Sequence, residues 1–587
     1  MIRACTLDEL KQKRCVVVRG SEHPIAVFID GDKINAVDNR CPHMGFPLSK
    51  GGVHDGILTC YWHHARFDLA SGCAFDLWAD DVPTAAIDVR DGQVFVSPEC
   101  HFADGDKDHW RRRLGEGMAQ NISLIIAKSV IAQSRAGVDY RQIVRDGALF
   151  GARHRDGWAS GMTILTAMAN LAGQLPEEER YLALYHGLSR VADDCDGQVP
   201  RRDRQALEGS DVDLATLKQW LRDWTRVRHR DGAERTLLTA VARGASPADL
   251  ADMLFSAATD RFYADGGHSL DFINKSFELL DLIGWAHAAA ILPTVVGQLV
   301  MARGGEESSA WRHPIDLIEL CNEAFAELSC WFDDGRGKRW AGEIAAAETI
   351  LAAEPDAIIA TLRDAIRAGA RPAQLTRAAC YAAAMRIARF GTSNEFGDWI
   401  TALHTFTYCN ALHQGMKRME RPDGSLPSLE AVRGTFHGAI SVYLDRFLNI
   451  PPAHLPGERG DERLDDEPAD AAELREKFLQ TLDTQQRANP AARIVARYLS
   501  LGHPVEPLTA TLARGVLRED ANFHTFQMLE VAIQQYREWP ADSSQARNIL
   551  IALARYAAAH APTERSQLQT AEIALKLHRG TPLHEEE

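Results

Sequence analysis

Two cysteines and two histidines near the N-terminus constrain this chain more than any other feature. They stand as Cys41-Pro-His43 and, after sixteen intervening residues, as Cys60-Tyr-Trp-His63. Each half supplies one thiolate and one imidazole, which suit either a zinc ion or an iron–sulfur cluster. Zinc fingers usually separate a cysteine pair from a histidine pair. A [2Fe–2S] centre with one iron on two cysteines and the other on two histidines needs this mixed set, so the pattern favours the cluster over zinc.

The residues around these four ligand candidates resemble the Rieske domains of ring-hydroxylating oxygenases and their ferredoxins. The resemblance rests on CPHMGFPL at 41–48 and CYWHHARFDLASG at 60–72. It implies that the two cysteines bind one iron and the two histidines bind the outer iron. Respiratory Rieske proteins carry an extra cysteine in each loop, whereas Phe46 and Ala65 stand here. The resemblance is therefore to the lower-potential kind.

Length and composition indicate a multidomain protein that does not bind polyanions. The 587 residues are too many for one core, so two or more domains are expected. The net charge of −16 argues against nucleic acid and anionic membranes as partners. No apolar run approaches the roughly 18 residues that cross a bilayer. The N-terminus does not read as a signal peptide and the cysteines show no disulfide framework, so we expect a cytoplasmic protein.

The composition of the chain and the spacing of its apolar residues change after about the first hundred residues. Residues 1–97 contain short β-rich runs separated by Gly and Asp turns, which predicts a small antiparallel β domain of the Rieske type. Residues 98–117 are polar and are expected to form a linker. Residues 118–587 are rich in Ala, Leu, Arg and Glu at helical spacing, with helix starts such as Ser246-Pro247. The predicted fold class is multidomain α+β, a Rieske domain followed by a large all-α domain.

The helical region contains two pairs of similar segments about 250 residues apart. YHGLSRVADD at 185–194 matches FHGAISVYLD at 436–445, and HSLDFI at 268–273 matches HTFQML at 524–529. These matches indicate that the helical domain is internally duplicated. Some short matches are expected by accident in an Ala-rich sequence, which is the alternative reading.

A duplication would bring equivalent histidines together. If tandem halves, about 130–350 and 355–577, pack around a pseudo-two-fold axis, paired histidines converge near that axis. Imidazoles on facing helices are a common way to build an iron site. The alternative for each histidine is a hydrogen-bonded core or capping residue. The candidate ligands of a second, non-heme iron are His186, His268, His404, His437 and His524.

Part of the helical region resembles the questin-oxidase-like family. The resemblance rests on HSLDFINKSFELL at 268–280 and HTFT at 404–407. That family is all-helical and includes enzymes that oxidatively open rings of aromatic polyketides. The resemblance implies that His268 and His404 bind iron. Some members are thought to add a carboxylated lysine, a role for which Lys275 is a poor candidate because no motif fixes its position.

The iron-binding pattern of ring-hydroxylating oxygenases is incomplete here. Those enzymes place their mononuclear iron on D-x2-H-x4-H within a β-rich domain. Asp265 and His268 supply the first half, but Ile273 stands where the second histidine belongs. The chain is therefore not an ordinary α-subunit of that class.

Two functions remain open. The first is an oxygenase-like oxidoreductase in which the Rieske cluster feeds electrons to a His-ligated iron that uses O2 to oxidise an apolar or aromatic small molecule. No G-x-G-x-x-G follows a strand, so an external NAD(P)H-dependent reductase or ferredoxin reductase would supply the electrons. The alternative is a Rieske electron-transfer protein whose helical domain is a partner-docking scaffold without a second metal.

Overall fold

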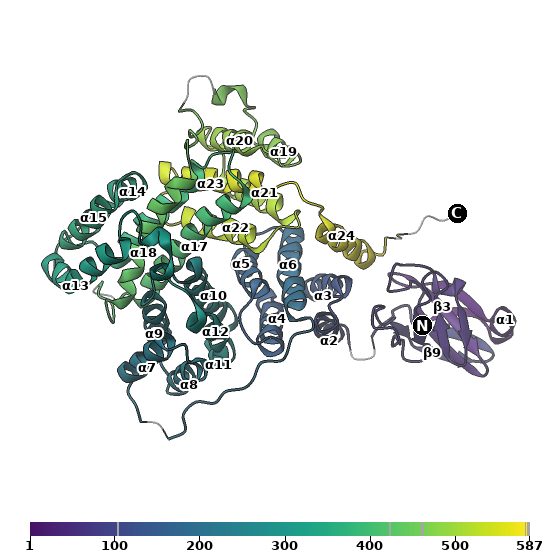
Figure 1. Cartoon of the computed structure of the whole chain (residues 1–587). Coiled ribbons are helices and arrows are strands. Elements are labelled where there is room, and N and C mark those ends of the chain that lie inside the picture. The colour runs from purple at the N-terminus through teal and green to yellow at the C-terminus, as the bar shows by residue number, and fades with distance from the viewer. Residues whose placement is uncertain (103–104, 210, 422–423, 459–462, 582, 584–587) are drawn as a thin grey trace. The chain divides into compact units, whose positions relative to one another are not determined.

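The computed structural model of the chain divides into two compact units, which are described separately. Figure 1 shows β-strands in the N-terminal part and helices elsewhere. The structure describes residues 1–102, 105–209, 211–421, 424–458, 463–581 and 583. Unit 1 comprises Met1–Gly147, Leu184–Asp196 and Ser566–Glu587, and unit 2 comprises Ala148–Ala183 and Gly197–Arg565.

The β part of unit 1 confirms the predicted small antiparallel domain. Three sheets have the strand orders β1-β10-β9, β2-β3-β4-β8 and β5-β6-β7, and all the pairings are antiparallel. One short helix, α1 (Leu7–Lys13), follows the first strand. The strands are β1 (Ile2–Thr6), β2 (Cys15–Arg19), β3 (Pro24–Asp30), β4 (Lys33–Asp38), β5 (Gly52–His54), β6 (Ile57–Thr59), β7 (Arg66–Asp68), β8 (Thr84–Ala85), β9 (Ile87–Arg90) and β10 (Gln93–Val96).

Strand β3 separates two hydrophobic cores. Its residues are buried on both faces because successive side chains point to opposite sides of a strand. Ile25 and Val27 pack into one core, and Ala26 and Phe28 pack into the other. The second core also contains the two motif cysteines and the residues that flank them. The two cysteine loops are therefore supported by a packed hydrophobic core.

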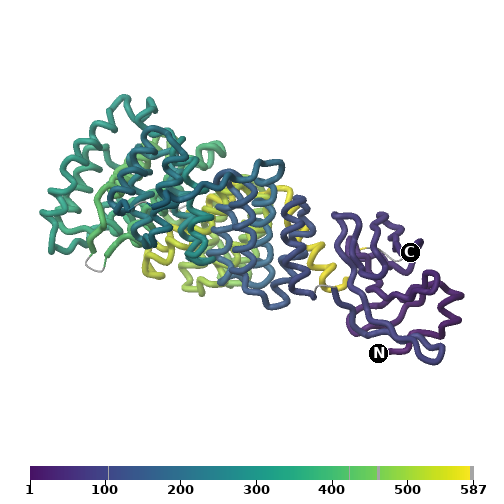
Figure 2. The backbone as a smooth tube through the Cα atoms, turned by 90° about the horizontal axis from the view of Figure 1, so that it is seen from below, coloured from purple at the N-terminus to yellow at the C-terminus, as the bar shows by residue number. Residues whose placement is uncertain are grey.

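Helices from both ends of the chain complete unit 1. α2 (Asp106–Ala119) and α3 (Ser123–Arg135) pack together, and α24 (Ser566–His578) packs on α3. In Figure 2 the yellow α24 lies beside these early helices, although more than four hundred residues separate them in the sequence. α2 lies largely within the segment that the sequence predicts as a linker.

The described residues of unit 2 form helices joined by loops, with no strand among them, as the sequence predicts, and the helices stack side by side (Figure 2). Ser246 caps α9 with a complete capping box, which confirms the helix start read from Ser246-Pro247. Two helices, α4 (Tyr140–His154) and α6 (Glu177–Cys195), run across the division between the units. The remaining helices are α5 (Ser160–Ala172), α7 (Leu214–Arg226), α8 (Arg230–Ala242), α9 (Pro247–Thr259), α10 (His268–Ile283), α11 (Ala288–Ile291), α12 (Pro293–Met301), α13 (Leu317–Gly335), α14 (Glu343–Ala352), α15 (Pro355–Arg367), α16 (Pro372–Ala388), α17 (Phe396–Met419), α18 (Arg433–Asp445), α19 (Ala471–Thr481), α20 (Ala488–Ser500), α21 (Val505–Leu517), α22 (Phe523–Tyr536) and α23 (Ser544–Ala559).

Helix α17 is the centre of unit 2. It is mostly buried and packs against α9, α10, α16, α18 and α22. Among the described residues, no single helix has both the length and the apolar character needed to cross a membrane. One bent pair, Trp285–Ile291 with Pro293–Glu307, meets the test of length and composition only when its two members are taken together.

Candidate metal centres

Two loops of unit 1 share one backbone conformation and present the motif cysteines. In the first loop the N–H of Cys41 donates to the Phe46 carbonyl (2.8 Å), and the N–H of Gly45 donates to the Cys41 carbonyl (2.7 Å). The second loop repeats both bonds around Cys60, at 2.9 Å each. The residue four positions after each cysteine has positive φ, +80° at Gly45 and +63° at His64. The sharp turn that follows each cysteine depends on this left-handed residue.

The four motif side chains converge as a cluster ligand set would require. A hydrogen bond between the two thiols raises the pKa of Cys41 and lowers the pKa of Cys60 to about 6. The His43 and His63 rings lie 4.9 Å apart, centroid to centroid. Nδ1 of His43 is buried without a hydrogen-bond partner among the described residues. Two facing sulfurs and two neighbouring imidazoles fit a [2Fe–2S] cluster with mixed ligands.

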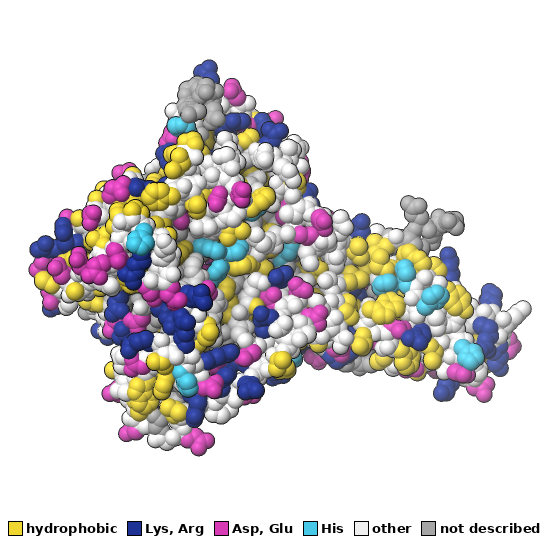
Figure 3. Space-filling model, viewed as in Figure 1, with side chains coloured by type: hydrophobic (Ala, Val, Ile, Leu, Met, Phe, Trp, Pro, Cys, Tyr) yellow, Lys and Arg dark blue, Asp and Glu magenta, His cyan; other side chains and the backbone are white. Residues whose placement is uncertain are grey.

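The histidine side of this site is open and apolar. Trp78 packs on His43 (4.8 Å between centroids), Trp62 packs on His63 (4.4 Å), and His63 is exposed. Burial, His63 and Lys128 lower the pKa of His43 to about 4, so its imidazole is neutral. Figure 3 shows hydrophobic side chains beside histidines on the surface of the β domain. We call the following exposed side chains the apolar rim: Tyr61, Trp62, Phe75, Leu77 and Trp78.

The β fold with these two loops defines a domain that carries electrons on an iron–sulfur cluster. Residues 1–84 match the family model of the Rieske [2Fe-2S] domain. The chain belongs to the Rieske [2Fe–2S] proteins, which assigns it a [2Fe–2S] cluster and an oxidoreductase or electron-transfer role. Its similarity to ferredoxins of oxygenase systems implies a redox partner such as a reductase or an oxygenase.

Known proteins similar to this chain cover its N-terminal part. The ferredoxin component of the p-cumate 2,3-dioxygenase system of Pseudomonas putida is 28% identical over 17% of this chain and 88% of its own length. The ferredoxin subunit of anthranilate 1,2-dioxygenase of Burkholderia cepacia is 33% identical over 16% of this chain and 85% of its own length. A solved ferredoxin of carbazole 1,9a-dioxygenase from Nocardioides aromaticivorans is 28% identical over 17% of this chain and 97% of its own, with a TM-score of 0.16.

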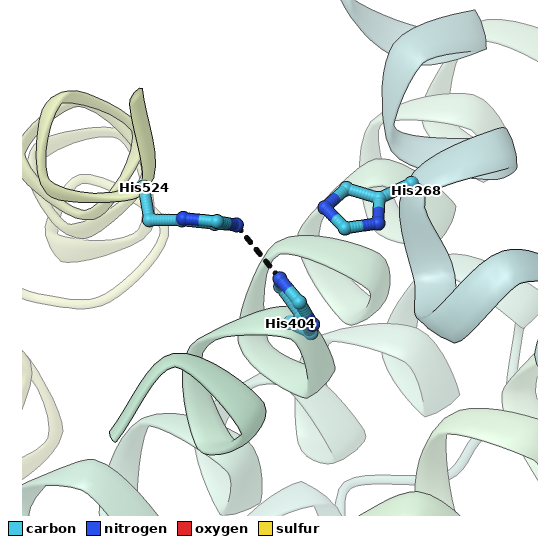
Figure 4. A group of neighbouring side chains, drawn as sticks. All are labelled: His268, His404 and His524. Carbon is cyan, nitrogen blue, oxygen red and sulfur yellow. Dashed lines mark hydrogen bonds between the residues drawn. The ribbon is translucent and has the colours of Figure 1, made fainter. Parts of the chain in front are cut away.

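Three of the five histidines that the sequence singles out come together in unit 2. His268, His404 and His524 come from α10, α17 and α22, and their side chains point toward one another (Figure 4). One ring nitrogen from each lies within 4.8 Å of the others. Nε2 of His404 and Nε2 of His524 are 2.8 Å apart. We call this group the histidine triad. Three converging imidazoles form a donor set for a transition-metal ion.

A tight backbone segment positions His268. Tyr263, Asp265, Gly266 and Gly267 all have positive φ, so the chain turns sharply just before α10 begins. The Nδ1–H of His268 donates to the Asp265 carbonyl at 3.2 Å, which leaves Nε2 as the acceptor. That Nε2 is buried and has no hydrogen-bond partner among the described residues. A ring held through one nitrogen, with a lone pair free on the other, is the usual state of a metal-binding histidine.

The other two triad histidines are half-buried and neutral. Burial, with His268 and His524 nearby, lowers the pKa of His404 to about 2. Burial, with His268 and His560 nearby, lowers the pKa of His524 to about 3. His524 is the second residue of α22, whose N-terminus Asn522 caps. Crowded neutral imidazoles favour a bound cation over protons at neutral pH.

A buried polar network begins one turn further along the helices that carry the triad. Gln527 donates to Asp271 at 2.5 Å. Lys275 donates to Glu278 at 2.7 Å and to Glu530 at 2.6 Å. All five side chains are buried. Sequence reasoning did not single out this network as a site, although the 256-residue offset between the duplicated segments pairs Asp271 with Gln527.

The two remaining candidate histidines lie elsewhere. His437, on α18, packs against Phe262, with 4.6 Å between the ring centroids. Its Nδ1 forms a hydrogen bond of 3.3 Å with the Tyr408 hydroxyl. Burial and Arg433 lower the pKa of His437 to about 3. His186 lies in the part of α6 that belongs to unit 1, whereas the triad belongs to unit 2. His186 and His437 belong to different units, so their pairing stays a prediction.

Proposed function

We propose that this protein is an oxidoreductase in which a Rieske cluster supplies electrons to a non-heme iron ion bound by the histidine triad. The cluster ligands in this proposal are Cys41, His43, Cys60 and His63. When bound, the cluster carries one electron at a time and the iron activates O2 for oxidation of an apolar or aromatic small molecule. The observation that carries the proposal is the convergence of three imidazoles in a chain that also has a Rieske domain.

The donor set supports a catalytic rather than a structural ion. Three nitrogen ligands leave coordination positions open for exogenous ligands, whereas structural sites are usually closed by four protein ligands. Imidazole suits iron, and it suits zinc and copper as well. The identity of the metal therefore has to come from analysis of the purified protein. The carboxylated lysine of the similar helical family finds no support here, because Lys275 already bonds to two carboxylates.

The surroundings of the triad support an apolar substrate. The Phe272 ring lies 5.4 Å and the Phe523 ring 5.8 Å from the ring of His268, centroid to centroid. Phe523 also packs on His524 at 3.8 Å. These rings offer an apolar surface beside the histidines. The relatives in the p-cumate and anthranilate dioxygenase systems make an aromatic compound a reasonable substrate class.

Electrons would reach the protein from outside. The sequence has no dinucleotide-binding fingerprint, so we propose an external NAD(P)H-dependent reductase or ferredoxin reductase. The apolar rim and the exposed edge of His63 are the surface on which such a protein would dock. A cytoplasmic location is part of the same proposal, because it keeps the cysteines reduced.

Iron and acid-labile sulfide, measured per chain on anaerobically purified protein, test the proposal. We expect about three irons with about two sulfides in the wild-type protein, and about two of each in His268→Ala. The matched control is His437→Ala, which removes another buried histidine of unit 2 and should retain the third iron. Wild-type protein with about two irons, even after reconstitution with ferrous iron, would contradict the second site.

The competing function is electron transfer alone. Several of the matched relatives are ferredoxin components, and stacked helices can serve as a docking scaffold. In that case the triad would be a packed group of core histidines. The same measurement separates the two functions, since a scaffold predicts iron only at the level of the cluster.

A further inference from the structure

A fully buried carboxylate in unit 1 lies between the cluster loops and the first helices of the helical region. Asp80 is 1% exposed and follows Trp78, which packs on His43. Arg113 of α2 donates to Asp80 at 2.8 Å, and Lys128 of α3 donates to it at 3.1 Å. The buried His109 ring also lies against this carboxylate, with Nε2 3.3 Å from it. An isolated carboxylate is rarely buried this completely, so these partners are what keep Asp80 ionised. Burial raises the pKa of Asp80, but Lys128, the hydrogen bond with His109 and Arg113 outweigh that effect and lower it.

The Lys128 ammonium also reaches the cluster loop itself. Its Nζ donates to the Pro42 carbonyl at 3.0 Å, and Pro42 stands between Cys41 and His43. The side chain is 8% exposed and its ammonium lies 5.5 Å from the centre of the Trp110 ring. The ammonium is therefore fixed by Asp80 on one side and by the peptide between two cluster ligands on the other.

Several charged side chains surround Asp80. Arg113 and Lys128 are buried cations that pair with it. Asp81, whose side chain is 14% exposed, pairs with Arg112. Glu116 pairs with Arg113, and its side chain is 39% exposed, so solvent screens it. Lys128 brings its positive charge to the cluster loop itself.

We propose that Lys128 raises the reduction potential of the Rieske cluster. Reduction adds one electron, and hence one negative charge, to the cluster without making or breaking a bond. A fixed cation in a buried position stabilises that added charge. Lys128 lies outside the matched residues 1–84, so a residue of the helical region tunes a cofactor held by the N-terminal domain. The proposal requires the cluster and is independent of a second metal.

The test is a reductive titration of the full chain with dithionite, followed by EPR, on four variants. Lys128→Met removes the charge, and Lys128→Arg keeps it. Asp80→Asn removes the opposing negative charge. Lys13→Met is the matched control, because Lys13 is an exposed lysine of α1 that pairs with Glu9.

The expected shifts have opposite signs. Lys128→Met should favour the oxidised cluster by about tenfold, which lowers the midpoint potential by about 59 mV for one electron. Lys128→Arg and Lys13→Met should stay within about threefold of wild type. Asp80→Asn should raise the potential, a change that general loosening of the fold would not produce. The Lys128→Met shift should persist at high salt because the charge is buried.

Three results would overturn the proposal. One is a potential within about twofold of wild type in Lys128→Met protein whose EPR spectrum shows an intact cluster. Another is a fall in potential in both Lys128→Met and Asp80→Asn, which would indicate a structural effect. If Lys128→Met does not retain its cluster, Lys128→Gln and Asp80→Asn decide the question, and an unchanged potential in both refutes the role of Lys128.

Discussion

Gln527 donates a hydrogen bond to Asp271 across 256 residues of sequence. Each stands three positions after a triad histidine, Asp271 after His268 and Gln527 after His524. His268 and His524 occupy equivalent positions in the two similar segments, and so do Asp271 and Gln527. The first pair supplies two rings of the triad, and the second pair forms a buried hydrogen bond. The contact ties the triad to the polar network beside it, while the duplication inferred from the sequence stays a prediction.

Replacing Gln527 by Met should destabilise unit 2. The Asp271 carboxyl would lose its hydrogen-bond donor while remaining buried, which costs about 1–3 kcal/mol. Chemical denaturation followed by circular dichroism measures this loss. The matched control is Gln480→Met, since Gln480 is an exposed glutamine of α19 whose side chain donates a hydrogen bond to Glu476. Equal midpoints for the two variants would show that the Asp271 contact contributes nothing.

Metal binding at the triad should depend weakly on pH. A protonated imidazole cannot bind a metal, so each ligand that titrates in the range studied costs tenfold in affinity per pH unit. The pKa of His404 is lowered to about 2 and that of His524 to about 3, so both stay neutral from about pH 8 to about pH 5. We expect the logarithm of Co²⁺ affinity, measured by absorption titration, to change by at most about one per pH unit.

A slope of two or more would mean that His404 or His524 takes up a proton in this range. The lowered pKa values also predict how the stability of the metal-free fold changes with pH. Below about pH 6.5 the unfolded imidazoles bind protons that the folded ones do not, so the metal-free fold should lose stability as the pH falls.

Gly267→Ala should disturb the triad more than a comparable change elsewhere. Gly267 has φ +94°, and an added Cβ would lie 3.2 Å from Cβ of Tyr408 and 3.3 Å from the His404 carbonyl oxygen. The control is Gly244→Ala, where φ is +77° and nothing lies within 4 Å of the added atom. Both pay about 1–2 kcal/mol of backbone strain. Only Gly267→Ala adds crowding against α17, so it should have the lower Tm and lose the third iron. Equal Tm values and equal iron contents would contradict this.

Cys60→Ser should remove the cluster without removing the metal of the triad. Cys60 is a buried ligand candidate in unit 1, and the triad is in unit 2. We expect loss of the visible absorbance and of about two irons and two sulfides per chain, with the remaining iron retained. Cys73→Ser is the control, because Cys73 is an exposed free cysteine and should leave the spectrum unchanged. Loss of all iron in Cys60→Ser would show that the two centres depend on each other.

Local sequence patterns predicted the Rieske loops and the helical region well. The cluster motif is short and local, so it predicts both ligand loops directly. The triad was predictable in part, because two similar segments point to His268 and His524. Two features had no local signal. The Lys128 contact with Asp80 joins residues 48 positions apart, and the separation of His437 from the triad depends on how α18 packs against α17.

The position of α24 has a consequence for how the chain matures. This helix packs on α3 and its Leu577 carbonyl accepts a hydrogen bond from Arg40 of the β domain, yet it follows every residue of unit 2 in the sequence. During synthesis the ribosome therefore releases the last piece of unit 1 only after unit 2 has emerged. If each unit folds as its residues emerge, unit 2 can finish folding before unit 1, although unit 1 begins first.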